Sequence, residues 1–354
     1  MHNPKIIRSL AIRAFMGLLL AALPCGWAQE AKTGPDAAQK MGGQGGLVYD
    51  KPQAPAELPG KGLAQHDFLY AGQQGFTVAV VRGGKVVWSY HDPKGQGEIS
   101  YAVMLSSGNI LFTHAYGMTE LSPDKTVVWN YDAPPKHEIH GAQPIGKDRV
   151  IFVQNGDPAK IIVANKVTGK FEREFTVPVG KPDDAHRQMR RARLTAAGTI
   201  VVAQTDLNKV AEFNENGQEV WSAKIDKPWS VERLANGNTL VCTYDLLVRE
   251  LNAKGETVWE FSAADVPPGY VMTKWQVATR LSSGNTLINN EGRWEPGACA
   301  ENAAPVQVFE VTPGKKIVWA LRSWVGPNAL TSSTTMQVLT EPGVPEGGHF
   351  GSIR

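Results

Sequence analysis

The chain has 354 residues, enough for two ordinary domains or for one large all-β domain. Its formal net charge is only +2 and no basic stripe runs along the sequence, so the composition gives no support for nucleic-acid binding. No apolar run reaches the roughly 20 residues that a membrane-spanning helix needs, and we expect no transmembrane segment.

Residues 1–28 have the pattern of a secretory signal peptide. Three basic residues, Lys5, Arg8 and Arg13, precede the apolar run AFMGLLLAAL, and Gly26-Trp27-Ala28 offers small residues where a signal peptidase reads them. We predict cleavage near Ala28 and a secreted or periplasmic protein. Cys25 leaves lipidation as an alternative, although Pro24 before it fits lipoprotein cleavage poorly.

The next segment, residues 29–62, is rich in Ala, Gly, Pro, Gln and Lys and has almost nothing to bury. Such a composition is typical of a flexible tether. Residues 63–354 are then expected to form a single domain.

Tryptophans recur in similar settings along this domain (GKVVW, KTVVW, GQEVW, GETVW and KKIVW), at Trp88, Trp129, Trp221, Trp259 and Trp319. The interval between Trp129 and Trp221 is about twice the usual one. It accommodates a unit without tryptophan, in which Arg173 takes the tryptophan position. The repeat therefore has six units, and we interpret its tryptophans as packing residues between neighbouring units.

Each unit begins with a strand, a polar turn and a second strand, as in SVERLANGNTLV and VATRLSSGNTLI. Four short strands repeated at about 40 to 45 residues are typical of a β-propeller blade. The first unit lacks its first strand, whereas TSSTTMQVLTEPG near the C-terminus reads as one. The sequence therefore predicts an all-β, six-bladed propeller of four-stranded blades, closed by the C-terminal strand joining the N-terminal blade.

Val167-Thr168-Gly169-Lys170 and Gly84-Lys85-Val86-Val87-Trp88 resemble the TGKxxW turn of quinoprotein-type (PQQ-like) propeller blades. The resemblance covers most of residues 66–340 and implies blade architecture. Quinone-dependent members have eight blades and commonly an adjacent cysteine pair, whereas this chain has six units and no adjacent cysteines, which does not favour PQQ. The cofactor is therefore left open, since no motif in the sequence requires one. The LxxGNTL turn is more weakly similar to bacterial arylsulfotransferase propellers, a resemblance that implies sulfuryl transfer through a histidine and arginines.

Five histidines are expected on the top face, onto which the links between blades open: His91, His114, His137, His140 and His186. Imidazole there could bind a ligand or act as a base or nucleophile. The spacing contains no HxH or HExxH pattern, so we predict no metal site.

Arginines cluster in HRQMRRARL, at the first strand of the fourth unit. Arg187 and Arg190 are the candidates to hold an anion. Arg193, Arg233 and Arg280 each precede a leucine, so we interpret them as a repeat feature paired with acids such as Glu232.

Tryptophans outside the repeat position suit the walls of a funnel. They are Trp229, Trp275, Trp294 and Trp324. The sixth unit carries an extra loop, NNEGRWEPGACAENAAP, with Arg293 and Trp294 as candidate ligand contacts. A disulfide between Cys242 and Cys299 could anchor this loop.

The leading hypothesis is an exported scaffold that binds a small molecule or a protein through a His-, Arg- and Trp-lined funnel on its top face, as a monomer. The alternative is a transferase or hydrolase acting on an anionic or aryl substrate, with His140 or His186 as nucleophile or base and Arg187 and Arg190 holding the anion. On either hypothesis, His140→Ala is expected to leave folding intact.

Overall fold

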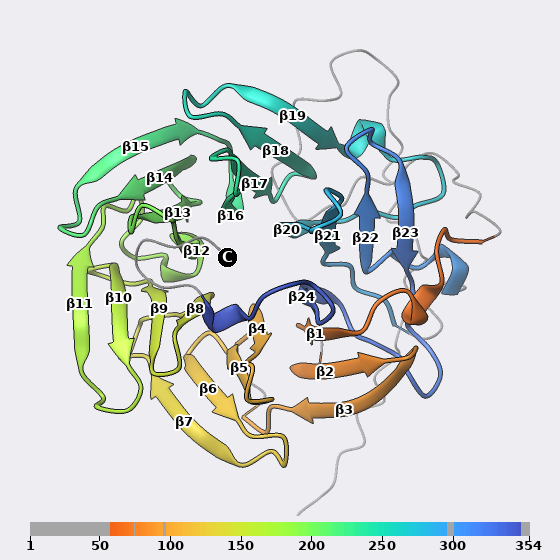
Figure 1. Ribbon diagram of the computed structural model, residues 1–354, viewed down its shortest axis with the longest axis horizontal. Coiled ribbons are helices and arrows are strands. Elements are labelled where there is room, and N and C mark those ends of the chain that lie inside the picture. Colours follow the sequence, from red (N-terminus) through yellow and green to blue (C-terminus); the bar gives the residue numbers. More distant parts are fainter. Residues whose placement is uncertain (1–56, 74, 95–96, 296–300, 348–354) are drawn as a thin grey trace, which may run out of the picture.

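The computed structural model describes residues 57–73, 75–94, 97–295 and 301–347, and it shows six four-stranded antiparallel sheets arranged in a ring (Figure 1). This confirms the predicted six-bladed propeller. The predicted signal peptide and residues 29–56 lie outside the described residues. In the described part of the chain, no helix has the length and apolar character needed to cross a membrane.

The strands of each blade are given from the centre of the ring to its rim. Blade 1 consists of β24 (Ser333–Val338), β1 (Phe68–Gly72), β2 (Thr77–Arg82) and β3 (Lys85–His91). Blade 2 consists of β4 (Tyr101–Met104), β5 (Ile110–Thr113), β6 (Gly117–Leu121) and β7 (Val127–Asp132). Blade 3 consists of β8 (Ala142–Ile145), β9 (Arg149–Gln154), β10 (Lys160–Asn165) and β11 (Phe171–Thr176).

The remaining blades follow the same order. Blade 4 consists of β12 (Met189–Leu194), β13 (Ile200–Gln204), β14 (Lys209–Phe213) and β15 (Glu219–Lys224). Blade 5 consists of β16 (Pro228–Arg233), β17 (Thr239–Thr243), β18 (Leu247–Leu251) and β19 (Thr257–Ser262). Blade 6 consists of β20 (Trp275–Arg280), β21 (Thr286–Asn290), β22 (Val308–Val311) and β23 (Ile317–Leu321). Short 3₁₀ turns are η2 (Gly62–Ala64), η3 (Ala185–Arg187), η4 (Ala263–Asp265), η5 (Glu301–Ala303) and η6 (Pro345–Gly347).

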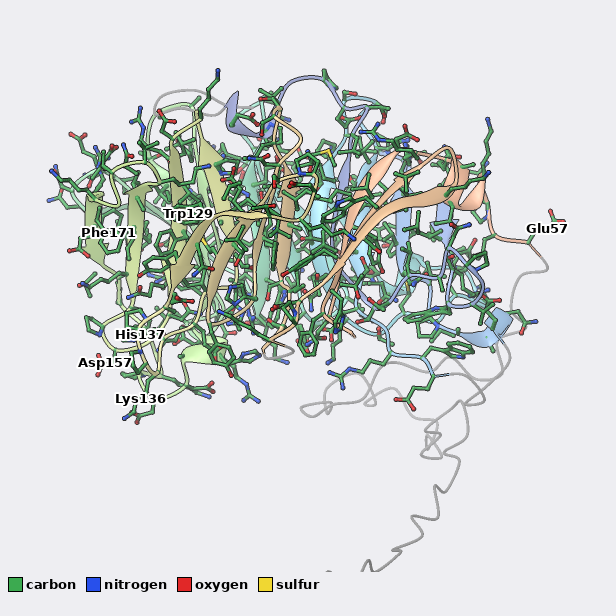
Figure 2. All side chains as sticks on the ribbon, turned by 90° about the horizontal axis from the view of Figure 1, so that it is seen from below. Glu57, Trp129, Lys136, His137, Asp157 and Phe171 are labelled. Carbon is green, nitrogen blue, oxygen red and sulfur yellow. The ribbon has the colours of Figure 1, made fainter. Side chains whose placement is uncertain are left out.

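The ring closes as predicted, because β24 from the C-terminal region pairs with β1, with Met336 opposite Tyr70. Closure leaves neither end of the chain of blades with an open inner edge. The apolar runs of the inner and middle strands pack between neighbouring blades, whereas the outermost strands of blades 1 to 4 carry only exposed and half-buried residues. The outermost strand of blade 6, β23, is mostly buried. Figure 2 shows the resulting disc edge-on, with Trp129 and Phe171 on its outer wall.

The repeat tryptophans join one blade to the next. The indole N–H of Trp88 donates to the carbonyl of Pro123 at 2.8 Å, that of Trp221 to Ala253 at 3.0 Å, and that of Trp259 to Pro313 at 2.8 Å. Each acceptor lies in the outer turn of the following blade. Arg173, in the tryptophan position of blade 3, lies 3.4 Å from Glu215 in the corresponding turn of blade 4. These contacts confirm the packing role predicted for this position.

The last residues of the predicted tether are packed on blade 6. Trp319 Nε1 donates to the carbonyl of Gly62 at 2.9 Å, and the amide of Ala320 donates to the carbonyl of Pro59 at 3.1 Å. Leu58 packs against the apolar core between blades 5 and 6. Residues 58–62 therefore belong to the folded part of the chain, which corrects the predicted boundary at residue 62.

A second inter-blade contact recurs one strand inward. Arg280 of blade 6 forms an ion pair with Glu250 of blade 5 at 2.8 Å, and Arg233 pairs in the same way with Glu212 of blade 4. This confirms that Arg233 and Arg280 are a repeat feature, although their partners are on β14 and β18 and do not include Glu232.

Arg193 does not belong to this set. Leu194 pairs with Ile200 where Arg233 pairs with Thr239, because the Arg-Leu pair of blade 4 lies one residue further from the turn, although the turns 195–199 and 234–238 are equally long. Leu194 therefore packs near Val163, in the place that Arg233 has in the next blade. Arg193 takes the register of Glu232, and the leucine that follows it in the sequence hides this shift.

Candidate functional site on the propeller axis

The strand register places one residue from each blade at the same height around the axis. At the top end of the inner strand, blades 1, 4, 5 and 6 have a β-bulge, and an irregular pairing near Asn155 corresponds to it in blade 3. A bulge re-aims side chains at the end of a strand. The residues at this position, here called the top layer, are Thr334, Ser100, His140, Arg190, Trp229 and Gln276.

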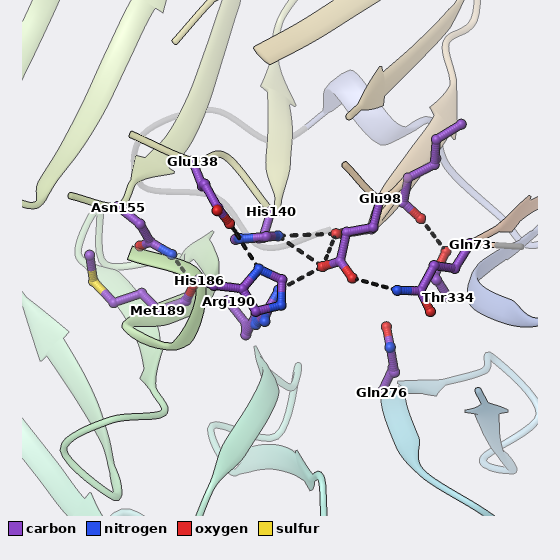
Figure 3. Close-up of polar contacts among 12 residues, drawn as sticks. Gln73, Glu98, Glu138, His140, Asn155, His186, Met189, Arg190, Gln276 and Thr334 are labelled. Atoms are coloured by element: carbon purple, nitrogen blue, oxygen red, sulfur yellow. Dashed lines mark hydrogen bonds and ion pairs between the residues drawn. The ribbon is translucent and has the colours of Figure 1, made fainter. Parts of the chain in front are cut away.

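The residues of the links add charged groups next to the top layer, and the result is one hydrogen-bonded network (Figure 3). His140 Nδ1 lies 3.0 Å from Glu98 Oε1, and His140 Nε2 lies 2.8 Å from Glu138 Oε2. The same Glu138 oxygen lies 2.9 Å from Nδ1 of His186. Arg190 Nη1 donates to Glu98 Oε1 at 2.7 Å. We call these five residues the top-face cluster.

The contacts within the cluster lower the pKa of both of its carboxylates. Burial by itself would raise the pKa of Glu98, but Arg190 and His140 outweigh it and hold this pKa well below its usual range. Burial also opposes ionisation of Glu138, and hydrogen bonds from His140 and His186 again lower its pKa. Both carboxylates are therefore ionised at neutral pH, and each lies within hydrogen-bond distance of a histidine, with Arg190 also donating to Glu98.

The two histidines of the cluster differ in what they can do. His140 is 1% exposed, and each of its ring nitrogens faces a carboxylate, so neither is available to a substrate. The side chain of His186 is 50% exposed, and its Nδ1 is held by Glu138. A carboxylate that orients one nitrogen leaves the other, Nε2, to exchange a proton.

Arg190 has hydrogen-bond donors beyond the one that it uses on Glu98. Its guanidinium stacks on Trp229 at 3.9 Å from the ring centre, and Trp229 in turn lies against Tyr244 at 4.6 Å. Within the described part of the chain, its Nε and Nη2 are buried without a hydrogen-bond partner. Gln73 donates to Glu98 at 2.9 Å, and its Oε1 is buried and also unpartnered among the described residues. Buried polar atoms of this kind are normally satisfied by protein, water or ligand.

Blade 6 contributes a second acidic group. Gln276 Nε2 donates to Glu291 Oε2 at 2.6 Å. Burial raises the pKa of Glu291, against the opposing effects of Lys274 and Gln276, and the charge of Glu98 adds to the increase. Lys274 lies over the ring of Tyr244 at 5.2 Å. The pKa of Glu291 is thus shifted in the opposite direction from those of Glu98 and Glu138.

Three of the five predicted histidines lie apart from the cluster. His91 is exposed on β3. His114 is buried beside Thr119, with Nε2 at 3.3 Å from Oγ1, and burial lowers its pKa. His137 Nδ1 donates to the carbonyl of Pro135 at 3.0 Å, and Figure 2 shows His137 at the edge of the disc with Lys136 and Asp157. Only His140 and His186 come together, with ring centres 5.0 Å apart.

Other predicted residues have structural positions. Trp275 is fully buried between Phe261 and Phe309 and is a core residue, because the bulge turns Gln276 rather than Trp275 to the axis. Trp294 is buried against Ala304 and Trp324. This corrects their assignment to funnel walls, whereas Trp229 reaches the axis.

Arg187 and Arg293 are exposed, and Arg187 lies 3.8 Å from Asp184. Arg190, the other candidate anion ligand, already pairs with Glu98. Cys242 is buried in β17, and burial raises its pKa beyond the range in which a thiol ionises. Cys299 lies outside the described residues, so the disulfide stays a prediction.

Glu98 and Glu138 were missed from the sequence, although a signal was present. The segments Gly97–Ala102 (GEISYA) and His137–Ala142 (HEIHGA) both place Glu-Ile directly before the top layer. Ile99 and Ile139 are fully buried, which fixes both glutamates in the same orientation in blades 2 and 3.

Glu98, His140 and His186 could also hold a metal ion, since a ligand atom from each lies within 4.8 Å of the others. The donor set suits a transition metal. The guanidinium of Arg190, at 2.7 Å from Glu98, opposes a cation at this position. The three ligand atoms therefore suit a metal ion, whereas the positive charge of Arg190 beside them opposes its binding.

No model of a known protein family matches the sequence, and no curated protein matches it. Solved structures do match. A Bacteroides caccae protein of unknown function has a TM-score of 0.66 and 24% identity, covering 77% of this chain and 97% of its own.

Two lyases match at lower similarity. A catalytically inactive histidine-to-alanine variant of Staphylococcus aureus virginiamycin B lyase with quinupristin has a TM-score of 0.52 and 14% identity, covering 78% of this chain and 92% of its own. A streptogramin B lyase has a TM-score of 0.52 and 12% identity, covering 81% and 86%. These likenesses agree with the class that the fold defines, the six-bladed β-propellers, and show the fold alone.

Proposed function

We propose that the protein is an exported propeller that binds a small polar ligand at the top-face cluster. The observation that carries the proposal is Arg190, which is 2% exposed, is already paired with Glu98, and has two further guanidinium nitrogens that are buried without a partner among the described residues. Leaving such donors unsatisfied is costly, and a ligand with acceptor oxygens relieves that cost.

The neighbouring groups indicate which ligand fits. Gln73 Oε1 can accept a hydrogen bond, Arg190 can donate, and the ring of His186 is half-exposed, so a ligand with several hydroxyl or carbonyl groups matches all three. Trp229 holds the guanidinium in place from one side and is not itself an open stacking platform.

Binding is tested on residues 29–354 by thermal unfolding with a panel of neutral sugars, hydroxy acids and aromatic acids. A compound that binds here raises the melting temperature, and this effect is lost in Gln73→Leu and His186→Ala. His91→Ala, which changes an exposed histidine away from the cluster, keeps it. The proposed site is contradicted if the compounds raise the melting temperature of both cluster variants as much as that of the native protein.

Export rests on the sequence of residues 1–28 and has its own test. The full chain, expressed in a bacterium with an outer membrane, should appear in the exported fraction with Gln29 as its first residue. Retention in the cytoplasm with Met1 intact contradicts export, and a lipid on Cys25 identifies the alternative.

A second candidate function is catalysis by His186. Its Nδ1 contact with Glu138 is the arrangement that orients a general base. A transferase, hydrolase or lyase step begins with such a base, and one similar propeller is a lyase whose inactive form lacks a histidine.

Catalysis predicts turnover of aryl sulfates or aryl esters that disappears in His186→Ala and falls in Glu138→Gln. If the protein only binds its ligand, the native chain does not turn over these substrates. Activity that remains in His186→Ala rules out this residue as the base.

A further inference from the structure

The axis below the top-face cluster contains a separate cavity of about 720 Å³. Its mouth lies at the bottom face, among the turns that follow the inner strands, near Leu105, Leu234 and Leu281. The volume is in the range of small-molecule sites. No residue of the top-face cluster lines it.

Two further layers of the inner strands form its wall. The deeper layer, one residue below the top layer, consists of Thr335, Tyr101, Gly141, Arg191, Ser230 and Val277. The next layer towards the mouth consists of Gln337, Val103, Gln143, Arg193, Glu232 and Thr279. Apart from Gly141, these residues line the cavity.

Arg191 is a buried cation at the deep end. It is 4% exposed, and its Nη2 donates to the carbonyl of Ser100 at 3.1 Å and to Thr335 Oγ1 at 2.6 Å. Gly141 makes room for this path, because a Cβ there would lie 3.3 Å from Arg191 Cγ. Both acceptors are neutral, so the guanidinium is held in place without being neutralised.

Arg193 brings a second positive charge to the same place. Both guanidiniums lie 5.1 Å from the centre of the Tyr101 ring, and Arg193 Nη1 donates to the carbonyls of Ala142 and Ala192. Within the described residues, no carboxylate lies within 4.0 Å of either arginine, whereas eight other arginines have such a contact. Burial, with the charge of Arg193, lowers the pKa of Arg191 to about 9.

The wall also carries Glu341, which lies at the mouth and accepts hydrogen bonds from Ser282, so the positive charge is concentrated at the deep end. Arg82, Arg233 and Arg280 also line the cavity, and each has its own carboxylate. Glu232 is the one carboxylate of the two layers, against two arginines. Buried charges are ordinarily paired, so the deep end is suited to a negative ligand.

From this arrangement we propose that the central cavity is a binding site for an organic anion, whose carboxylate, sulfate or phosphate group meets Arg191 and Arg193 at the deep end. Val103 and Val277 line the cavity alongside them and contact the apolar part of the ligand. Guanidinium groups bind oxyanions through charge-assisted, often bidentate hydrogen bonds. The site is separate from the top-face cluster and does not depend on its function.

Sister blades supply the variants that test the site. Arg191→Ser and Arg193→Thr introduce the residues that blades 5 and 6 have at the same register, Ser230 and Thr279. The matched control is Arg233→Leu, which also changes an arginine of the cavity wall and copies Leu194 of blade 4.

The probes are benzoate, inorganic sulfate and the neutral benzamide, titrated into residues 29–354 by calorimetry at constant ionic strength. Benzoate is expected to bind saturably and benzamide not. Each of Arg191→Ser and Arg193→Thr should weaken benzoate binding at least about tenfold, as expected for loss of a charge-assisted hydrogen bond. Arg233→Leu lowers the melting temperature but keeps the affinity.

Sulfate that binds with the same dependence on the two arginines also supports the site. The proposal is overturned if neither anion binds at millimolar concentration, if benzamide binds as well as benzoate, or if binding survives both substitutions in folded variants. Circular dichroism of each variant establishes that it is folded.

Discussion

The indole nitrogen of Trp319 donates a hydrogen bond to the carbonyl oxygen of Gly62, 2.9 Å away. In other blades the same nitrogen reaches the next blade along the ring. At the junction of blades 6 and 1, the segment before β1 takes over this role. The residues in front of the first strand thus complete the inter-blade contacts.

A methyl group at position 60 should disrupt this contact. Gly60 has φ +87° and a Cβ there would overlap the side chain of Trp319. We expect Gly60→Ala to lower the free energy of unfolding by about 2–4 kcal/mol, from backbone strain and steric overlap together. Urea denaturation measures the change.

Gly62→Ala is the matched control, since Gly62 also has positive φ but a Cβ there meets nothing within 4 Å. It should cost only the backbone strain, about 1 kcal/mol. Equal effects of the two substitutions would show that the contact with Trp319 adds nothing.

The Arg280–Glu250 pair should behave as a unit. Glu250 accepts hydrogen bonds from Asn236, Asn238 and Arg280, and Glu250→Val leaves Arg280 half-buried without its partner. We expect a loss of about 2–3 kcal/mol in unfolding free energy.

Adding Arg280→Met to Glu250→Val copies the junction of blades 1 and 2, where Val80 packs near Met104. The double variant should regain about half of the loss, because it removes the unpaired charge but not the unsatisfied asparagines. The coupling would be contradicted if the double variant lost as much unfolding free energy as Glu250→Val and Arg280→Met lose separately, added together.

The two histidines of the top-face cluster should differ in their effect on folding. His140→Ala leaves Glu98 and Glu138 buried without the ring between them, and we expect it to cost about 3 kcal/mol. His186→Ala, at a half-exposed position, should change stability by less than about 1 kcal/mol. The expectation that His140→Ala leaves folding intact is therefore replaced. Thermal unfolding of both variants at pH 7 compares them.

Stability should fall in acid partly through Glu98. Its pKa in the folded protein lies well below the value of about 4.3 in the unfolded chain, so the unfolded state binds more protons near pH 4. This contribution is present above about pH 4.3 and is lost as the pH falls towards the folded pKa. Glu98→Gln should make the slope of unfolding free energy between pH 5 and 3 shallower, by up to about 1.4 kcal/mol per pH unit.

Glu291→Gln should act in the opposite direction. Burial raises the pKa of Glu291 in the folded protein, so its contribution is largest at low pH and declines as the pH rises through that pKa. Removing it should make the gain in stability with rising pH steeper. Slopes that change in the same direction in both variants would contradict the assignment of these two carboxyl groups.

The fold could be predicted because each blade carries its own local signals. The Gly-Asn turns, the repeat tryptophans and the strand-like TSSTTMQV segment act within a few residues, and they located the blades and the closing strand. The packing of residues 58–62 could not be predicted, since a short Gly- and Pro-rich segment gains its order only from the surface of Trp319 and its neighbours.

The site was predictable only in part. Reasoning from the links between blades brought His140 and His186 to one face, and the structure places them together. It could not separate them from His91, His114 and His137, because distance from the axis depends on where each link runs. The shift of Arg193 by one position arises because the Arg-Leu pair of blade 4 lies one residue further from the turn than that of blade 5, which the strand pairing reveals.

The pairing of β24 with β1 joins residues more than 260 positions apart in the chain. A ribosome must therefore finish almost the whole protein before blade 1 can exist as a four-stranded sheet. Until then, β1 presents a free hydrogen-bonding edge that can recruit strands from other chains. A product truncated before Ser333 keeps that edge permanently, and we expect it to aggregate rather than to form a stable five-bladed ring.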